Sequence, residues 1–150
     1  MQRTCFLFGN ADAPYSIFPN LEQTIESEAA AGTSVFYVGN HGNFDRFAAS
    51  ALRTVKQRYP EISIQLVLAY HPSDRKVETT AGFDGTYYPP LEGSPRRYAL
   101  VRANQYMVKV SDSIICYVRH HGNSLKLLVR AARLAKTKKL KILNLASSLP

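Results

Sequence analysis

The feature that most constrains the fold is an alternation of short apolar runs with segments of helical periodicity. Five runs are apolar over the length of a strand, and they cover residues 4–8, 35–38, 62–70, 113–118 and 140–145. Apolar residues recur every three or four positions over about residues 20–31, 43–59, 96–110 and 124–135. Strands that alternate with helices are typical of an α/β protein with right-handed crossovers. We therefore predict one three-layer α/β domain, residues 1–150, with a mostly parallel five-stranded sheet.

The segment from residue 71 to residue 95 interrupts this alternation. Its many glycines and prolines predict a long irregular loop. A loop of this length is unusual in a compact domain and is often a lid or a binding loop. The aromatic residues Phe83, Tyr87 and Tyr88 could stack on a ligand there, or they could simply hold the loop against the body of the domain. The sequence leaves both interpretations open.

Glycine-asparagine pairs follow three of the predicted strands. In a parallel sheet the carboxyl ends of the strands meet at one edge, and ligands bind there. We therefore predict ligand contacts from these turns, at Gly9, Asn10, Gly39, Asn40, Gly42, Asn43, Gly122, Asn123 and Ser124. The turns contain neither a G-x-G-x-x-G fingerprint nor a P-loop. The alternative is structural, because every parallel α/β protein needs tight turns between its strands and helices.

The second of these turns leads directly into a predicted helix. Asn43 is positioned to cap that helix, since its side-chain oxygen could accept an amide N–H of the first turn. Asp45 then places a negative charge near the positive end of the helix dipole. Asp45 and Glu92 are weak candidates for acid-base catalysis, with Asp12 as a third carboxylate near the same edge. For Asp45, a role at the start of the helix is the simpler interpretation.

The net charge of +8 is distributed unevenly. Residues 1–95 carry 7 Lys and Arg against 10 Asp and Glu, whereas residues 96–150 carry 12 against 1. A basic half indicates an anionic partner, such as a nucleotide, a nucleic acid or a membrane surface, or else a solvated helix surface. Arg97 and Arg102 are the arginines we predict to contact a phosphate, because a guanidinium can bind one bidentately.

Other classes of protein fit this sequence poorly. No apolar run approaches the ~18 residues of a membrane span, and the N-terminus does not resemble a signal peptide. We therefore expect no membrane partner and a cytoplasmic location. Cys5 and Cys116 both lie in predicted strands, so we expect buried, reduced thiols. The four histidines have no metal-ligand spacing and no clustered acidic residues, so we predict no metal site.

Several stretches of the chain resemble a known family. They are Tyr-Val-Gly-Asn-His-Gly-Asn-Phe-Asp-Arg-Phe-Ala-Ala at 37–49, Pro-Arg-Arg-Tyr-Ala at 95–99, Arg-Ala-Asn-Gln-Tyr-Met-Val at 102–108 and Ser-Asp-Ser-Ile-Ile-Cys-Tyr-Val at 111–118. With their order along the chain, they are similar to the small YpsA-like proteins of the SLOG superfamily, which includes the DprA and LOG proteins. The resemblance spans nearly the whole chain.

This resemblance implies a single Rossmann-like domain with a pocket for a nucleotide or a nucleotide derivative at the glycine turns. Carried over by position, it assigns Gly39, Gly42, Phe44 and Asp45 to the turn after the second strand, and Asn104, Met107 and Val108 to the helix before the fourth. The chain lacks the Pro-Gly-Gly-x-Gly-Thr-x-x-Glu signature of the LOG hydrolases, and with it their catalytic glutamate.

Three functions follow as hypotheses. The first is binding of a nucleotide or an ADP-ribose-like ligand at the sheet edge, in the manner of a sensor. The second is cleavage or transfer of a nucleotide N-glycosidic bond, as in phosphoribohydrolases, with Asp45 or Glu92 as acid or base; whether the chain is an enzyme stays open. The third is nucleic-acid binding through the basic C-terminal half. A homo-oligomer is common for domains of this kind, by analogy only.

Overall fold

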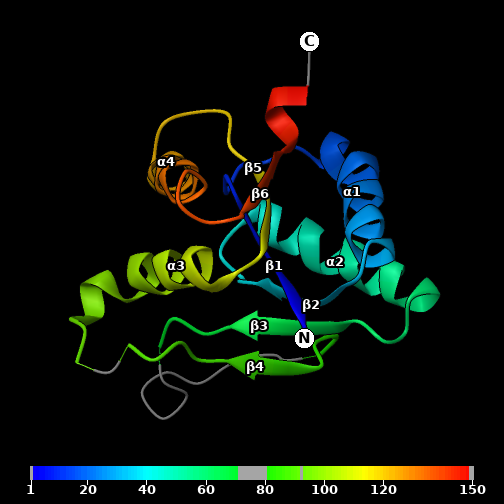
Figure 1. Cartoon of the computed structure of the whole chain (residues 1–150), viewed down its shortest axis with the longest axis horizontal. Coiled ribbons are helices and arrows are strands. Elements are labelled where there is room, and N and C mark those ends of the chain that lie inside the picture. The colour runs from blue at the N-terminus through cyan, green and yellow to red at the C-terminus, as the bar shows by residue number, and fades with distance from the viewer. Residues whose placement is uncertain (1, 71–80, 92, 149–150) are drawn as a thin grey trace.

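The computed structural model describes residues 2–70, 81–91 and 93–148. Its centre is a six-stranded, entirely parallel sheet in the order β4-β3-β2-β1-β5-β6. The strands are β1 (Arg3–Gly9), β2 (Thr33–Val38), β3 (Ser63–Val67), β4 (Gly85–Tyr87), β5 (Ser113–Tyr117) and β6 (Lys141–Asn144). Figure 1 shows β1 in the middle of the sheet, where it pairs with β2 on one side and with β5 on the other. The prediction of a parallel α/β sheet is therefore confirmed.

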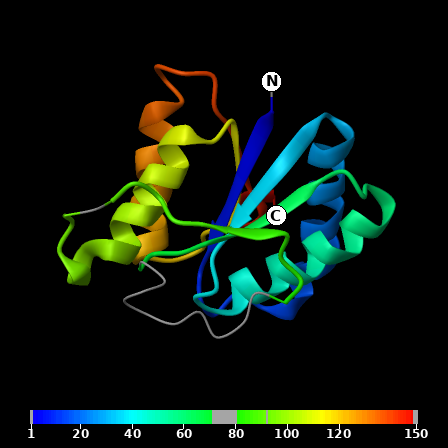
Figure 2. The same ribbon diagram turned by 90° about the horizontal axis from the view of Figure 1, so that it is seen from below.

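Four helices cover the two faces of the sheet. They are α1 (Phe18–Ala30), α2 (Asn43–Arg58), α3 (Ala99–Val110) and α4 (Asn123–Leu134), and short 3-10 turns occupy Tyr15–Ile17, Arg96–Tyr98 and Leu145–Ser148. In Figure 2, α1 and α2 lie on one side of the sheet and α3 and α4 on the other. This is the three-layer arrangement that the alternating pattern predicts.

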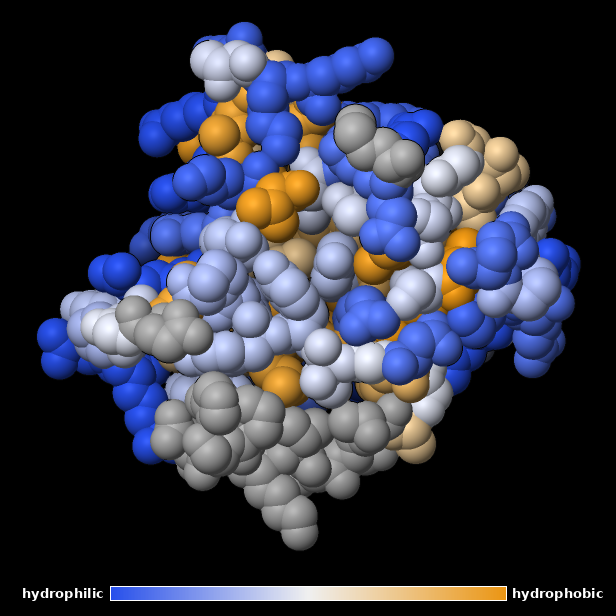
Figure 3. Space-filling view, turned by 60° about the horizontal axis from the view of Figure 1, so that its bottom comes forward, coloured by the Kyte–Doolittle hydropathy of each residue, from blue (hydrophilic) through white to orange (hydrophobic). Residues whose placement is uncertain are grey.

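Each face of the sheet has its own hydrophobic core. On the α1–α2 face, Leu21, Phe36, Phe44 and Leu52 are fully buried, and on the α3–α4 face Phe6, Met107, Ile114 and Ala131 are at most 1% exposed. Burial of one such large side chain contributes roughly 1.5–3 kcal/mol. On the face of the molecule in Figure 3, hydrophobic residues form small separate patches among hydrophilic ones. Most of the large apolar side chains are thus buried in the two cores.

The sheet has six strands, so the prediction of five is wrong by one. The additional strand, β4, lies in the segment predicted to be a long loop. Its entry is fixed by Asp84, whose backbone N–H donates to the Ile64 carbonyl (2.8 Å) and whose carboxylate accepts the Ile64 N–H (2.7 Å). The Tyr87 ring lies 5.4 Å from the Tyr37 ring, and Phe83 packs against the α1–α2 core. These two aromatic residues hold their segment against the domain.

The start of α2 differs from the prediction. Gly42, not Asn43, is the N-cap residue, and Asn43 is the first residue of the helix. The reason is a competing set of contacts with the loop after β1. The Asn43 N–H donates to the Ala11 carbonyl (2.8 Å), and its side-chain amide donates to the Ala13 carbonyl (3.4 Å). Asp45 lies in the first turn of α2, as predicted.

Two further sequence predictions can be compared with the described residues. Cys5 and Cys116 are buried free thiols, as predicted, and burial raises the pKa of each to about 12. In the part of the chain that the structure describes, no helix is both long enough and apolar enough to cross a membrane.

Candidate ligand-binding site

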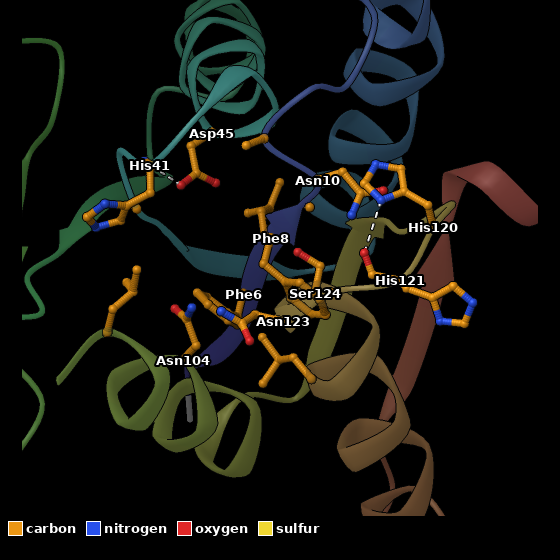
Figure 4. Close-up of a pocket in the computed structure, with 17 residues that line it drawn as sticks. Phe6, Phe8, Asn10, His41, Asp45, Asn104, His120, His121, Asn123 and Ser124 are labelled. Atoms are coloured by element: carbon orange, nitrogen blue, oxygen red, sulfur yellow. Dashed lines mark hydrogen bonds between the residues drawn. The ribbon is translucent and has the colours of Figure 1, made fainter. Parts of the chain in front are cut away.

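A cavity of about 300 Å³ opens at the carboxyl ends of β1 and β5. These neighbours mark the point where the order of strands reverses, because β1 is followed by β2 on one side while β5 lies on the other. Such a switch point separates the adjoining loops and leaves a crevice in which ligands bind. The wall comes from β1 and the loop after it, from the turn after β2 with the start of α2, from α3, and from the turn after β5 with the start of α4 (Figure 4). The fold alone therefore brings four segments of the chain to one cavity.

The cavity collects most of the predicted ligand-binding residues. Those that line it are Gly9, Asn10, Gly39, Asp45, Asn104, Gly122, Asn123 and Ser124. The predicted contacts Asn40, Gly42, Asn43, Arg97 and Arg102 are not among the lining residues. The Arg97 guanidinium lies over the Tyr98 ring, 4.8 Å from its centre. Glu92 lies outside the described residues.

Two of the turns at this edge share the sequence His-Gly-Asn, at 41–43 and 121–123. In each turn the glycine is the N-cap residue of a helix. Its φ is positive, 128° at Gly42 and 139° at Gly122. Their surroundings differ. A side-chain carbon on Gly42 would lie 2.7 Å from the Ala11 backbone, whereas one on Gly122 would meet nothing within 4 Å. The α2 turn is packed against the β1 loop, and the α4 turn is open.

The start of α4 is also the better place for an anion. The first N–H groups of a helix have no partner within it, and together with the helix dipole they favour negative charge. The first turn of α4 contains no acidic residue, whereas Asp45 occupies the first turn of α2. Gly122, Asn123 and Ser124 line the cavity at this point. Of the two helix starts, α4 can therefore accept a phosphate.

Asp45 lies across the cavity from α3, and Figure 4 shows Asp45 and Asn104 on opposite walls. One Asp45 oxygen accepts the backbone N–H of His41 at 2.9 Å. Burial raises the pKa of Asp45 to about 6, against the opposite effect of that hydrogen bond. The carboxylate is therefore charged at neutral pH and becomes protonated in mild acid. It can accept N–H groups of a ligand, and it can exchange a proton near pH 6.

Asn10 has a positioning role. Its side-chain oxygen accepts the Arg119 N–H at 2.8 Å, and its backbone N–H donates to the Tyr117 carbonyl at 2.9 Å. Asn10 is only 4% exposed. It ties the loop after β1 to the turn after β5 and so fixes the distance between two walls of the cavity. Gly9 has a structural role as well, because a side-chain carbon there would lie 2.5 Å from the Phe44 ring.

His120 and Asp12 form a second link across the rim. His120 Nε2 lies 2.8 Å from Asp12 Oδ1, and His120 Nδ1 lies 3.1 Å from the His121 carbonyl oxygen. The hydrogen bond with Asp12 is the main reason that the pKa of His120 is raised, and the same bond lowers the pKa of Asp12. Both side chains are exposed. In the described residues, no group of three or more His, Cys, Asp and Glu side chains is arranged to hold a metal ion.

Sequence reasoning missed the apolar and histidine parts of the wall. The missed residues are Phe6, Leu7, Phe8, Ala11, His41, Leu100, His120, His121 and Leu127. A signal for some of them was present, since Phe6 and Phe8 alternate with Leu7 at the end of the strand that precedes the first Gly-Asn pair. Leu100 and Leu127 face the cavity from helices, where their spacing marks them equally well as core residues.

No protein-family model and no curated protein matches this chain. Among solved structures, one similar fold is the molybdenum cofactor binding protein from the phototrophic bacterium Rippkaea orientalis, with a TM-score of 0.64 and 18% identity. That match covers 99% of this chain and 82% of the other. Another is the Moco Carrier Protein from Chlamydomonas reinhardtii, with a TM-score of 0.56, 9% identity, and coverage of 99% and 94%.

Identities this low show a shared fold over nearly the full length of this chain, and no more. The Rossmann-like fold implied by the resemblance to YpsA-like proteins is thereby confirmed. Membership of the SLOG superfamily stays a prediction, since no comparison bears on it.

Proposed function

We propose that this protein binds a phosphorylated small molecule of the nucleotide or pterin class in the β1–β5 cavity, and that the molybdenum cofactor is its ligand. The observation that carries the proposal is the open Gly122 turn, which shares one cavity with the half-buried Asp45 and with Asn104. The two proteins of similar fold support the choice of ligand, because both are described as binding or carrying that cofactor.

The residues of the cavity suit such a ligand. The molybdenum cofactor is a pterin derivative that carries a phosphate, so it needs an anion site and a polar partner for the pterin ring. We assign the phosphate to the backbone N–H groups at Asn123 and Ser124. We assign the pterin edge to the Asp45 carboxylate and the Asn104 amide, which offer acceptors and a donor. Phe8 and Leu127 give the apolar surface that ligand pockets commonly provide.

The proposal is tested by direct binding. Purified protein is incubated without oxygen with cofactor released from a molybdoenzyme, and free cofactor is removed by gel filtration. We expect about one molybdenum and one pterin for each chain. Asn104→Ala should weaken retention about tenfold, since an unpaired polar group of the ligand costs on the order of 1–3 kcal/mol. Asn20→Ala, an exposed change on α1, is the matched control and should retain cofactor normally. No retention by the unmodified chain would refute the proposal.

A phosphoribohydrolase-like reaction is the second candidate, and one observation favours it. A carboxyl group with a pKa near 6 is suited to general acid-base catalysis at neutral pH. In this case Asp45 would exchange a proton with a nucleotide whose N-glycosidic bond is cleaved. Incubation with AMP, NAD and ADP-ribose, followed by detection of released base, tests the idea. If Asp45→Asn released base as fast as the unmodified chain, this role for Asp45 would be excluded.

Other sequence predictions stay proposals. Nucleic-acid binding through the basic C-terminal half predicts a gel shift that disappears steeply with added salt. A homo-oligomer predicts a hydrodynamic mass above that of one chain. The cytoplasmic location likewise stays a prediction.

A further inference from the structure

A second cavity lies beside the first, in a groove between α3 and α4. Its volume is about 250 Å³, close to that of the β1–β5 cavity. Leu100, Asn104, Asn123 and Leu127 line both cavities. The groove is therefore continuous with the proposed ligand site, and it begins at the open start of α4.

The groove is basic and has no acidic residue of its own. Neither α3 nor α4 contains an aspartate or a glutamate. Lys126, Arg130 and Arg133 recur at helical spacing along the groove side of α4. Among the ion pairs found in the described residues none involves these three side chains, whereas Lys141 pairs with Glu28 at 2.7 Å. The groove thus concentrates positive charge that the described part of the protein does not neutralise.

The groove also exposes apolar surface. Val101 is 38% exposed and Val129 is 42% exposed, which is high for valine in a helix that packs on a sheet. Both line the groove. A planar base could lie against this surface while its phosphates contact the basic side chains, a combination typical of nucleotide sites.

The size of the first cavity argues for an extension. At about 300 Å³, the first cavity lies at the lower end of the range for ligand pockets. We take this as room for one nucleotide-sized unit. A phosphate at Asn123 lies at the junction of the two cavities. Arg130 is seven residues further along α4, or roughly 10 Å at 1.5 Å per residue. A diphosphate and its attached nucleoside can span that distance.

We propose that the groove is a second subsite, which takes the nucleoside half of a diphosphate-linked, dinucleotide-type ligand. The inference rests on the proposed function, because the first half of the ligand occupies the β1–β5 cavity. The diphosphate lies between Asn123 and Lys126, Arg130 contacts the distal half, and the distal base lies on Val101 and Val129. The protein therefore prefers the dinucleotide form of the molybdenum cofactor to the form that ends in a single phosphate.

The test compares these two forms of the cofactor as ligands of the full chain. We expect the dinucleotide form to bind at least about tenfold more tightly, since hydrogen bonds to charged groups contribute on the order of 1.5–3 kcal/mol. In the double variant Lys126→Gln, Arg130→Gln this preference should fall to about twofold or less. The double variant Lys136→Gln, Lys139→Gln removes two exposed charges just after α4 and should keep the full preference.

Failure of this inference can be told apart from failure of the proposed function. Equal binding of the two forms by the unmodified chain would overturn the second subsite and leave the cofactor site intact. The subsite is also overturned if the dinucleotide form gains nothing while an acidic helical peptide binds in a manner that depends on Lys126 and Arg130. The groove would then serve a protein partner. If neither form of the cofactor binds, the proposed function fails and the second subsite fails with it.

Discussion

At the scale of single residues, Asp45 couples the stability of the protein to its site. Burial raises its pKa in the folded state to about 6, above the ordinary value of 3.8. The unfolded chain therefore releases this proton at lower pH than the folded chain does. As pH rises from about 4 to about 6, Asp45 makes folding progressively less favourable, by at most about 3 kcal/mol. Above pH 7 the cost is constant.

This linkage gives a prediction for Asp45→Asn. Asparagine keeps an oxygen that accepts the His41 N–H but cannot ionise, so the variant should gain stability relative to the unmodified chain between pH 4 and pH 7. Urea unfolding at several pH values measures the difference. A difference that does not depend on pH would show that burial does not perturb this carboxyl group. We expect the same variant to bind the proposed ligand more weakly, a cost in function that often accompanies gains in stability at functional sites.

The two His-Gly-Asn turns provide a matched pair of substitutions. Gly42→Ala forces a methyl group to within 2.7 Å of the Ala11 backbone, at a φ that disfavours any side chain. Gly122→Ala has the same unfavourable φ but open space around it. We predict that Gly42→Ala lowers the free energy of unfolding by about 2–4 kcal/mol, and Gly122→Ala by about 1 kcal/mol.

Ligand binding should reverse the order of these two variants. Because the Gly122 turn faces the cavity, its added methyl group should reduce affinity for the ligand, and any Gly42→Ala protein that folds should bind normally. Thermal unfolding and retention of cofactor, measured on both variants, check the pair. Normal binding by Gly122→Ala would argue against a phosphate at the start of α4.

The sequence reveals those residues of the site whose position is set by local turn chemistry, and it misses those whose position depends on tertiary contacts. Gly39, Gly122 and Asn123 belong to turns, and turn chemistry is local, so a pattern of letters identifies them. The phosphate contacts predicted at Arg97 and Arg102 rested on residue type alone, and neither lines the cavity. The sequence favours Asn43 as a cap because it does not show the Ala11 carbonyl, a tertiary partner thirty-two positions away that accepts the Asn43 N–H.

At the scale of elements, the helices and long strands could be predicted because their apolar periodicity extends over many residues. β4 could not, since a strand of three residues that begins with a glycine carries no periodic pattern. Its cause is tertiary. Asp84 binds Ile64 by two hydrogen bonds and lies 3.1 Å from Lys56, which holds the segment at the edge of the sheet. An edge strand this short depends on such anchors more than on its own sequence.

This dependence predicts the effect of Asp84→Ala. The substitution leaves the Ile64 N–H without its side-chain acceptor, so we expect a loss of about 1–2 kcal/mol in the free energy of unfolding. Amide hydrogen exchange should become faster at Ile64 and Leu68, the residues of the β3 edge that bond to this segment, and stay unchanged in β1 and β5. Asp84→Asn keeps an acceptor, so its free energy of unfolding should lie between those of Asp84→Ala and the unmodified chain. Uniformly faster exchange throughout the sheet would contradict a local anchor.

At the scale of the whole molecule, the site lies where two differently charged parts of the chain meet. The loop after β1 belongs to the acidic part and the turn after β5 to the strongly basic one. The Asp12–His120 pair joins them across the rim of the cavity. Both ring nitrogens of His120 face an acceptor, the Asp12 carboxylate on one side and the His121 carbonyl on the other. Only the protonated imidazole can donate to both.

The rim should therefore be held by a contact that depends on pH. The pKa of His120 is raised in the folded protein by Asp12 and the His121 carbonyl. The contact is therefore complete below the ordinary pKa of histidine, about 6.5, and is lost as pH rises through the higher folded value.

If the rim retains the ligand, the rate constant for ligand dissociation should increase between pH 6 and pH 8. His120→Gln can donate only from its amide, so its rate should show no such dependence in this range. Stopped-flow release of cofactor from both proteins makes the comparison. A rate that rises equally with pH in the His120→Gln protein would place the titrating group elsewhere, with Asp45 as the first candidate, because its pKa of about 6 also lies in this range.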